Sequence, residues 1–565
     1  METKLCQNCN HEFEITEEDA HYYKKIRVPH PSWCSECRRV RRFSFQNTWN
    51  LHWRNCDKCG NRTLSLYSPE QELTVYCQPC WWKDDWDGTE YAMDYDPARP
   101  FLDQLKELAR KTPYSALTSL YTSLKNSDYS NALAWSKDCS FVFWADFCEN
   151  VYNSSLLNTL KNSADCIRGF ESELCYESIG FEKCYRTFYS EECDNCVDVW
   201  FSRNCYNCTN CIGCANLRGE SNCIFNVKYS HEEYIARAAE MRLDTRSGID
   251  ALQKKADVFF LTESYRAYHG SPLNVNVSGE YVYESKNSHE MYIANGAEDC
   301  KWVEFITVHS AKDCRDYSGW GNNATEIYEA VTVGENANSV MFALECWPDV
   351  MNLQYCIWNT AGKNNFGCAN LKRKQHCILN KEYTKEAFEI LRAQIIEDMK
   401  VRPYVDALGR TFPYGEFFPL EFSNFPYNKS NAMRFFPKTK EQALAEGYTW
   451  SDAIAPVVAN SIDGELLPQT IKEVDETILK EAIGCIECGR AYRIAKMEYD
   501  LLLKMNLPLP RLCLKCRENR RFKRMNSPKL WDRHCAKCGT DIQTAYNPEG
   551  PEIVYCVSCY QQEFV

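Results

Sequence analysis

The sequence predicts a mainly β protein in which two short parallel β-helix (solenoid) segments lie between two small cysteine-rich modules, with a few capping and connecting helices. Three observations predict this fold class. Eight Cys-x-x-Cys pairs occupy the two ends of the 565-residue chain, cysteines recur at fixed intervals in its middle, and amphipathic helical patterns follow both regular stretches. A chain of this length exceeds one hydrophobic core, so we expect several domains.

The two ends are copies of one another. The N-terminal cysteines recur, without a gap, 479 residues later. Other residues keep the same offset, since Arg38, Arg42 and Phe43 match Arg517, Arg521 and Phe522. This match indicates an internal duplication. The paired cysteines are Cys6/Cys9, Cys34/Cys37, Cys56/Cys59 and Cys77/Cys80 at one end, and Cys485/Cys488, Cys513/Cys516, Cys535/Cys538 and Cys556/Cys559 at the other.

The spacing of these pairs predicts metal sites. A Cys-x-x-Cys pair lets two thiolates from one tight turn reach the same ion, and two pairs complete a tetrahedron. Four cysteine ligands leave no open position, so we expect structural zinc, about four ions per chain, rather than catalytic zinc. Sequential pairing is favoured over a cross-brace that joins the first pair to the third. Free or redox-active thiol pairs are the remaining alternative.

Family resemblance supports this interpretation. Cys6-Gln7-Asn8-Cys9, Tyr22, Pro31 and Cys34 to Arg39 resemble the bacterial "probable zinc-binding domain" of treble-clef type. Cys485, Tyr492, Pro510, Cys513 and Cys516 resemble a second copy, and the segment 553–560 is similar to small bacterial zinc ribbons. The chain therefore resembles bacterial zinc-ribbon proteins that carry this domain at both ends. The resemblance implies zinc ribbons and no reaction.

The middle of the chain has a short period. Cys139, Cys148, Leu157, Cys166, Cys175, Cys184 and Cys193 follow one another at intervals of nine. A fixed short period with one small apolar residue per unit is typical of a solenoid. We expect about two nine-residue units per coil, with the small residues stacked inside. The run Cys205, Cys208, Cys211, Cys214 is interpreted as core thiols, with a further zinc site or an iron–sulfur cluster as alternatives.

A second regular stretch follows. Ile327 and Val340 continue from Cys314 at intervals of thirteen, and the segment 213–229 recurs as 367–383. Helical patterns at 232–256 and 385–400 then predict caps that cover the open ends of the two solenoids.

These patterns predict seven segments. The terminal modules span 1–85 and 485–565, and the β-helices span 126–232 and 274–384. Between them lie a connector with a helix at 100–111 (86–125), a capping helix and linker (233–273), and a helix followed by a Pro- and aromatic-rich connector (385–484). Within the last segment, 402–436 is expected to be ordered and 471–483 to form a short helix.

Charge is unevenly distributed. The net charge of −13 argues against non-specific nucleic-acid binding by the whole chain. Residues 485–534, however, hold thirteen Lys or Arg against five Asp or Glu. We expect basic helix faces that are solvated, or whose arginines pair with the acidic β-helix, with contact to nucleic-acid phosphate or to an acidic protein as the alternatives. The candidate residues are Arg38, Arg39, Arg41, Arg42, Arg517, Arg520, Arg521, Lys523 and Arg524.

The expected function is a non-enzymatic zinc-binding scaffold that recruits a protein partner through modules that fold independently of the β-helices. Nucleic-acid or ribosome binding is one alternative, and a carbohydrate-binding or polysaccharide-acting β-helix is another. No catalytic constellation stands out. No apolar run of membrane-spanning length and no signal-like start occur, so we expect no membrane association and a cytoplasmic, reducing location.

Overall fold

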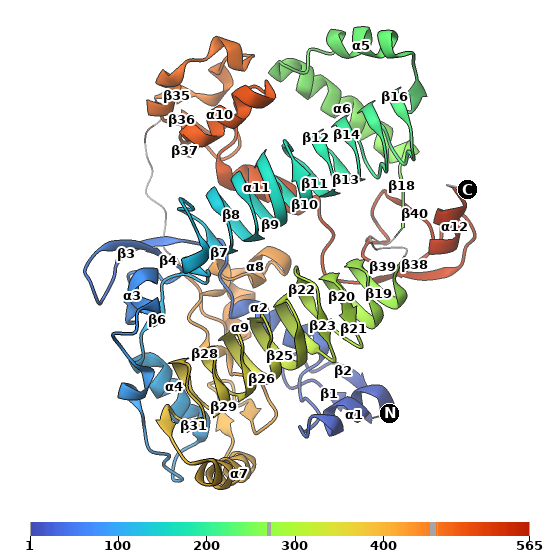
Figure 1. Ribbon diagram of the computed structural model, residues 1–565. Coiled ribbons are helices and arrows are strands. Elements are labelled where there is room, and N and C mark those ends of the chain that lie inside the picture. The colour runs from blue at the N-terminus through green and yellow to red at the C-terminus, as the bar shows by residue number, and fades with distance from the viewer. Residues whose placement is uncertain (1, 268–269, 271–272, 453–458, 460, 564–565) are drawn as a thin grey trace. The chain divides into compact units, whose positions relative to one another are not determined.

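The computed structural model describes residues 2–267, 270, 273–452, 459 and 461–563. Parts of the predicted linker 233–273, of the connector 385–484 and of the C-terminal module, at 268–269, 271–272, 453–458, 460 and 564–565, lie outside these residues. The chain forms two compact units, and each unit combines two distant stretches: 1–118 with 269–452, and 119–268 with 453–565. Each terminal module is thus grouped with the repetitive segment farther from it in the sequence (Figure 1).

The first repeat sheet, β7–β17, belongs to the second unit. All its pairings are parallel except the last, and paired residues are twelve apart, as in Cys139 with Val151 and Cys211 with Cys223. Its strands are β7 (Asn131–Ala134), β8 (Lys137–Asp146), β9 (Glu149–Ala164), β10 (Ile167–Glu173), β11 (Ile179–Glu182), β12 (Tyr185–Phe188), β13 (Glu191–Asp194), β14 (Val197–Trp200), β15 (Thr209–Ile212), β16 (Ser221–Ile224) and β17 (Val227–Lys228).

A backbone period of three underlies this register. Every third residue from Asn126 to Phe225 has a positive φ in the left-handed region, where Asn, Asp and Gly carry the smallest penalty. The residue after each of these positions supplies the core, so all cysteines from Cys139 to Cys223 are buried in a single cluster. The nine-residue interval is therefore three of these periods. The expectation of about two nine-residue units per coil was wrong, because strands pair at twelve residues.

Small polar side chains are satisfied inside this core. The Ser154 hydroxyl donates to the Tyr152 carbonyl at 2.8 Å and accepts the N–H of Cys166, twelve residues later, at 2.9 Å. The Cys166 thiol likewise donates to the carbonyl of Ala164 at 3.3 Å. Burial raises the pKa of the Cys175 thiol well above its usual value. Burial therefore favours the neutral thiol at Cys166 and Cys175.

The second repeat sheet, β19–β32, belongs to the first unit and is less regular. Its register steps are mostly twelve, thirteen or fourteen residues; Ile327 pairs with Val340 and Ala297 with Ala311. A pairing of β23 with β25 closes a barrel-like ring of six parallel strands. The strands are β19 (Val275–Tyr283), β20 (Lys286–Asn295), β21 (Ala297–Glu298), β22 (Glu304–Ile306), β23 (Ala311–Lys312), β24 (Arg315–Gly321), β25 (Ala324–Gly334), β26 (Asn338–Cys346), β27 (Met351–Gln354), β28 (Ile357–Thr360), β29 (Lys363–Phe366), β30 (Ala369–Lys372), β31 (Cys377–Ile378) and β32 (Lys381–Glu382).

The terminal modules match element by element. Each contains two hairpins, and each hairpin leads to a helix that begins at a cysteine. The N-terminal module comprises β1 (Glu2–Leu5), β2 (Glu12–Ile15), α1 (Glu17–Lys25), α2 (Ser35–Ser44), β3 (His52–Asn55), β4 (Arg62–Ser65), β5 (Val75–Tyr76) and α3 (Gln78–Trp82). The C-terminal module comprises β36 (Ile483–Gly484), β37 (Ala491–Tyr492), α10 (Lys496–Met505), α11 (Leu514–Lys523), β38 (Trp531–His534), β39 (Asp541–Thr544), β40 (Ile553–Val554) and α12 (Val557–Gln562).

The short strand before the last helix of each module pairs with a strand from elsewhere in its unit. β5 pairs in parallel with β6 (Tyr114–Ser115), and β40 pairs in parallel with β18 (Tyr265–Arg266). The duplication thus includes the way each module is attached.

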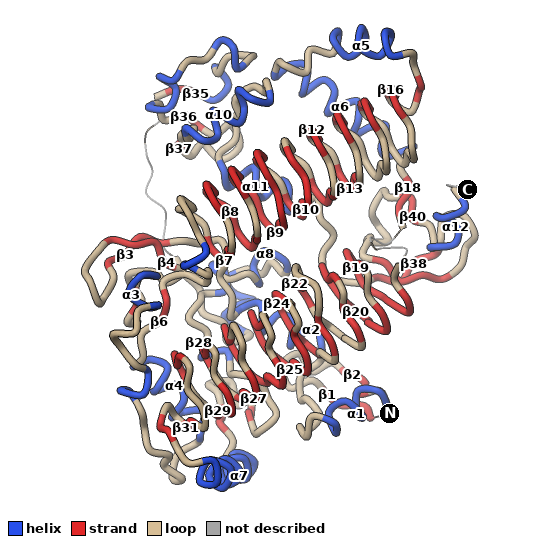
Figure 2. Tube along the Cα trace, in the orientation of Figure 1, coloured by secondary structure: helices blue, strands red, loops and turns tan. Residues whose placement is uncertain are grey.

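Helices flank the sheets (Figure 2). The predicted helix at 100–111 is α4 (Phe101–Lys111), with Pro100 as its N-cap, and the one at 385–400 is α7 (Lys385–Val401). The predicted helix at 232–256 is divided into α5 (His231–Glu240) and α6 (Arg246–Glu263), and α5 contacts β16. No helix among the described residues is long and apolar enough to cross a membrane.

The segment 471–483, predicted to form one short helix, forms two separate 3₁₀ helices, Ile471–Glu473 and Glu476–Lys480. The Asp475 carboxylate accepts the N–H of Thr477 at 2.9 Å, which caps a turn at the point where an α-helix would have to continue.

The connector 402–436 is ordered, as expected from its aromatic content. Phe412, Phe417 and Phe418 are buried, and Phe417 packs edge-on against Phe45 of the N-terminal module. The Gly415 N–H donates to the Tyr355 hydroxyl at 2.9 Å. The segment therefore joins the N-terminal module to the second repeat sheet.

Candidate metal centres

Sixteen cysteines form four groups, and in each group the four sulfur atoms lie within 4.8 Å of one another. The groups join neighbouring pairs in the sequence, so the pairing is sequential and not a cross-brace. They are Cys6, Cys9, Cys34 and Cys37; Cys56, Cys59, Cys77 and Cys80; Cys485, Cys488, Cys513 and Cys516; and Cys535, Cys538, Cys556 and Cys559.

The first pair of each group lies on a tight turn after a β-strand. In all four turns the first cysteine accepts, through its carbonyl, the N–H of the residue four positions on, at 2.8–2.9 Å. That residue has a positive φ and is Asn10, Gly60, Gly489 or Gly539. An added Cβ would meet nothing within 4 Å at the three glycines. Backbone conformation, not space, therefore favours glycine there.

The second pair of each group begins a helix. The third cysteine is the N-cap, and its N–H donates to the sulfur of the first cysteine, from Cys34 to Cys6 at 3.2 Å and from Cys513 to Cys485 at 3.3 Å. Burial alone would raise the pKa of the Cys485 thiol. Backbone N–H groups, that of Cys513 first, outweigh burial and lower this pKa to about 7. Such donors stabilise a thiolate.

The geometry fits a tetrahedral four-thiolate metal site. Zinc–sulfur bonds of about 2.3 Å give tetrahedral edges of about 3.8 Å. The sulfur atoms of Cys9 and Cys34 are 3.9 Å apart. The equivalent sulfur–sulfur distances, Cys59 to Cys77, Cys488 to Cys513 and Cys538 to Cys556, are 3.8 Å. The same edge therefore has the length of a zinc–thiolate tetrahedron at all four centres.

The run from Cys205 to Cys214 does not form such a group within the described part of the chain. Its four cysteines are successive core positions of the three-residue period, and each thiol donates to the carbonyl two residues before it. This arrangement supports the interpretation as core thiols over a further metal site.

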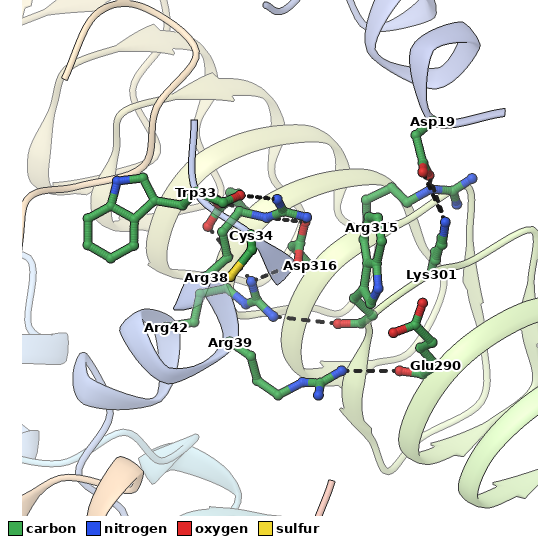
Figure 3. A network of polar contacts seen from close by, with 12 residues as sticks. Asp19, Trp33, Cys34, Arg38, Arg39, Arg42, Glu290, Lys301, Arg315 and Asp316 are labelled. Atoms are coloured by element: carbon green, nitrogen blue, oxygen red, sulfur yellow. Dashed lines mark hydrogen bonds and ion pairs between the residues drawn. The ribbon is translucent and has the colours of Figure 1, made fainter. Parts of the chain in front are cut away.

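The helix that follows the first N-terminal centre carries arginines into the second repeat sheet (Figure 3). Arg38 and Arg42, one turn apart on α2, bind the two oxygens of Asp316, at 2.7 and 3.1 Å. Arg42 also contacts Glu304 at 3.1 Å, and Arg39 contacts Glu304 at 2.6 Å. All these side chains are buried. The metal turn and the repeat sheet are thus connected by a charge network excluded from water.

The C-terminal module repeats this contact on the first repeat sheet. Arg517 and Arg521 of α11, the counterparts of Arg38 and Arg42, bind the two oxygens of Asp165. Arg521 also contacts Glu177, twelve residues beyond Asp165, at 3.2 Å. Burial lowers, but Asp165 and Glu498 raise, the pKa of Arg517, and the net shift is well upward. Both buried arginines therefore stay charged.

The exposed basic faces expected from the sequence are mostly absent. Six of the nine candidates, Arg38, Arg39, Arg41, Arg42, Arg517 and Arg521, are buried and paired with carboxylates, because unpaired guanidinium groups would be costly there. Of the two expected arrangements, solvated or paired with the acidic repeat, these six arginines show the paired one. Arg520, Lys523 and Arg524 are exposed.

Sequence reasoning missed the acidic partners Asp165, Asp316, Glu304, Glu329 and Glu498. Asp165 precedes an inward cysteine, but Asp138, Asp299 and Asp313 do so as well. A pattern along the chain does not select the one aspartate that lies opposite the helix. The sequence signal that could have indicated a buried contact is the match of Arg38 and Arg42 with Arg517 and Arg521. A solvated helix face does not require arginine at the same positions in both copies.

Comparison of the chain with protein-family models, with curated proteins and with solved structures finds no match.

Proposed function

We propose that this chain is a zinc-stabilised scaffold protein, in which two pairs of treble-clef or zinc-ribbon modules lock two β-helix solenoids into rigid binding surfaces. The observation that carries the proposal is the set of four cysteine groups with one shared geometry. The twelve-residue parallel register and the single cluster of inward residues, one at every third position, support the solenoid assignment.

Zinc is the metal that this donor set favours. Each group offers four thiolates, which suit zinc or iron, and four protein ligands leave no position for a substrate. When bound, zinc would supply folding free energy by fixing hairpin and helix together. The residues themselves position α2 and α11, so that Arg38, Arg42, Arg517 and Arg521 reach their carboxylates. A reducing, cytoplasmic location is proposed because the sites need free thiols.

A protein partner is proposed for the edge formed by the bends that follow β7 and β8. Trp135 and Phe147 stack there with ring centroids 5.3 Å apart and planes 8° apart, and they are 39% and 48% exposed. Rigid exposed aromatic residues are enriched at energetic centres of protein interfaces. The burial of most arginines makes nucleic acid the weaker alternative.

Metal analysis of the purified chain tests the proposal. We expect about four zinc ions per chain by elemental analysis. Iron at the same stoichiometry, visible by its thiolate absorption bands, would contradict the zinc assignment. Two or fewer ions with all sixteen thiols protected from alkylation would contradict the four-site arrangement.

Co-purification of proteins with the variants Trp135→Ser and Phe147→Ser tests the proposed partner face. Tyr185→Ser is the control variant.

A further inference from the structure

A cluster of positive charge surrounds Glu191 in the second unit. Arg203 Nε lies 2.7 Å and Arg266 Nη2 3.4 Å from Oε2 of Glu191, and Arg524 Nε lies 2.6 Å from Oε1. The three arginines come from the repeat, from β18 and from the residue after α11. This contact set holds three guanidinium groups and one carboxylate.

Two of these arginines retain unused donors. Arg203 and Arg524 contact Glu191 through Nε, and their Nη groups have no hydrogen-bond partner in the part of the chain that the structure describes. Their side chains are 21% and 33% exposed, so solvent reaches them. The Phe260 ring covers one face of the Arg203 guanidinium at 4.4 Å and holds it in place. The site therefore offers anchored guanidinium forks to a ligand.

The arginines at this site act on one another and on Glu191. Burial would raise the pKa of Glu191, but Arg203, Arg524 and Arg266 lower it well below its usual value. The pKa of Arg203 is lowered, first by burial and also by Arg266 and Arg524, although Glu191 acts in the opposite direction. Glu192 and Glu177 act on Arg266 and Arg524 as well, but burial still disfavours the charged form of Arg203, and a bound anion would favour it.

We propose that Arg203, Arg266 and Arg524, anchored on Glu191, form a binding site for a phosphate monoester dianion or free phosphate. Guanidinium forks match the oxygen geometry of phosphate. The guanidinium forks of Arg203 and Arg524 offer more donors than the two oxygens of one carboxylate can accept, and a phosphate group brings three further acceptor oxygens. Arg524 ends α11, and Arg266 lies on β18, which pairs with β40 of the C-terminal module, so the inference rests on the proposed function of that module.

Calorimetric titration of the full-length, metal-loaded chain with inorganic phosphate tests the site. We expect saturable binding that chloride at the same ionic strength does not reproduce. Arg203→Gln and Arg524→Gln should each weaken binding by about tenfold or more, as for loss of one charged hydrogen bond. Arg186→Gln is the matched control, since Arg186 pairs through Nε with one carboxylate, Asp198, on the same sheet. It should bind phosphate as the wild type does.

Two further variants separate a binding site from a structural clamp. Glu191→Gln removes the competing carboxylate, so phosphate should bind more tightly, whereas a clamp without a ligand site predicts no such gain. Arg524→Lys keeps the charge at a partly exposed position and should bind with intermediate affinity, even if Arg203→Gln fails to fold.

A monoester probe, phenyl phosphate, distinguishes the two possible sources of the phosphate group. Tighter binding than that of phosphate indicates an esterified ligand, and equal or weaker binding indicates the free ion. Unchanged phosphate binding in Arg524→Gln, or equal loss in Arg186→Gln, would overturn the proposal.

Discussion

The two module–repeat junctions share one contact and differ around it. In both, two arginines one helical turn apart form ion pairs with one aspartate. Arg38 and Arg42 bind Asp316, and Arg517 and Arg521 bind Asp165. The residue just before the second arginine of each pair has different surroundings in the two copies. Arg41 is fully buried, contacts Glu329 at 2.7 Å and stacks on Trp33, whereas its counterpart Arg520 is 56% exposed and pairs with Glu487 of its own module.

This difference separates the part of the duplicated interface that both copies share from the part that they do not. Leu512 occupies the position equivalent to Trp33, so the aromatic ring that covers Arg41 has no counterpart at Arg520. Glu518 likewise replaces Arg39, which contacts Glu304 in the first unit. The two-arginine grip on one aspartate has persisted through these changes, while the surrounding charges have diverged. The first unit therefore has the more deeply embedded module.

Loss of a metal centre should have the largest effect. Structural zinc contributes about 10 kcal/mol or more to the folding of small modules. Cys6→Ser and Cys485→Ser should each lower the metal content by one ion. Each should also expose the repeat sheet of the same unit to limited proteolysis, because the buried carboxylates lose their arginines. The effect should be greater for Cys6→Ser. Cleavage confined to the module in both variants would instead support the expectation from sequence that modules fold independently.

Removal of the shared aspartate should be the next largest effect. Asp316→Asn and Asp165→Asn each leave two buried guanidinium groups without their common anion, which costs about 3–5 kcal/mol in comparable buried pairs. Chemical denaturation should show similar losses for the two variants. The control Glu326→Gln, at the partly exposed pair with Lys25, should change stability by less than about 1 kcal/mol. A loss limited to one unit would show that the two grips are not equivalent.

Substitution of the divergent arginine should separate the units. Arg41→Gln leaves Glu329 buried without this partner and should destabilise the first unit by about 3 kcal/mol. Arg520→Gln removes an exposed pair and should cost at most about 1 kcal/mol. Unfolding monitored by a unit-specific readout, such as hydrogen exchange, measures both. Equal effects would contradict the difference in embedding.

A core cysteine should give the smallest effect. Cys175→Ala removes one buried sulfur that ligates nothing, so stability should fall by about 1 kcal/mol and the metal content should stay the same. Elemental analysis and denaturation on one sample provide the comparison with Cys6→Ser. Loss of an ion in Cys175→Ala would show that the core thiols bind metal.

The sequence predicts local features of this molecule better than it predicts which parts meet. The four cysteine groups, α4 and α7 follow from spacing and apolar periodicity, which are properties of short segments. The cysteine interval of nine was assigned to the wrong repeat because it is a multiple of the underlying period of three. Cysteine marks only some inward positions; Val142, Ala145 and Ser154 occupy others, so the shorter period is hidden.

The arginines illustrate the harder problem. Arg38 and Glu36 both lie on a helix that reads as polar, and no local pattern distinguishes the buried side chain from one outside the core. Asp316 lies 278 residues from Arg38, and the N-terminal module docks on the repeat that is farther away in sequence. Pairing of distant segments is decided by shape and charge complementarity, which one sequence without its fold does not reveal.

The three-residue period decides which side chains of the repeats face the core. A single inserted residue would move every later cysteine from the core to the surface, unless the insertion is absorbed at once. The second repeat sheet contains such absorbed insertions. Its thirteen-residue steps place Asn323, Asn336 and Asp349 one above another, joined by side-chain hydrogen bonds of 3.0 Å, and Asn322 and Glu335 just before the first two also have positive φ. One extra residue at the equivalent place in each register step keeps the later core residues facing inward. Length changes in this protein are therefore expected as whole turns of twelve, or as single residues repeated in register.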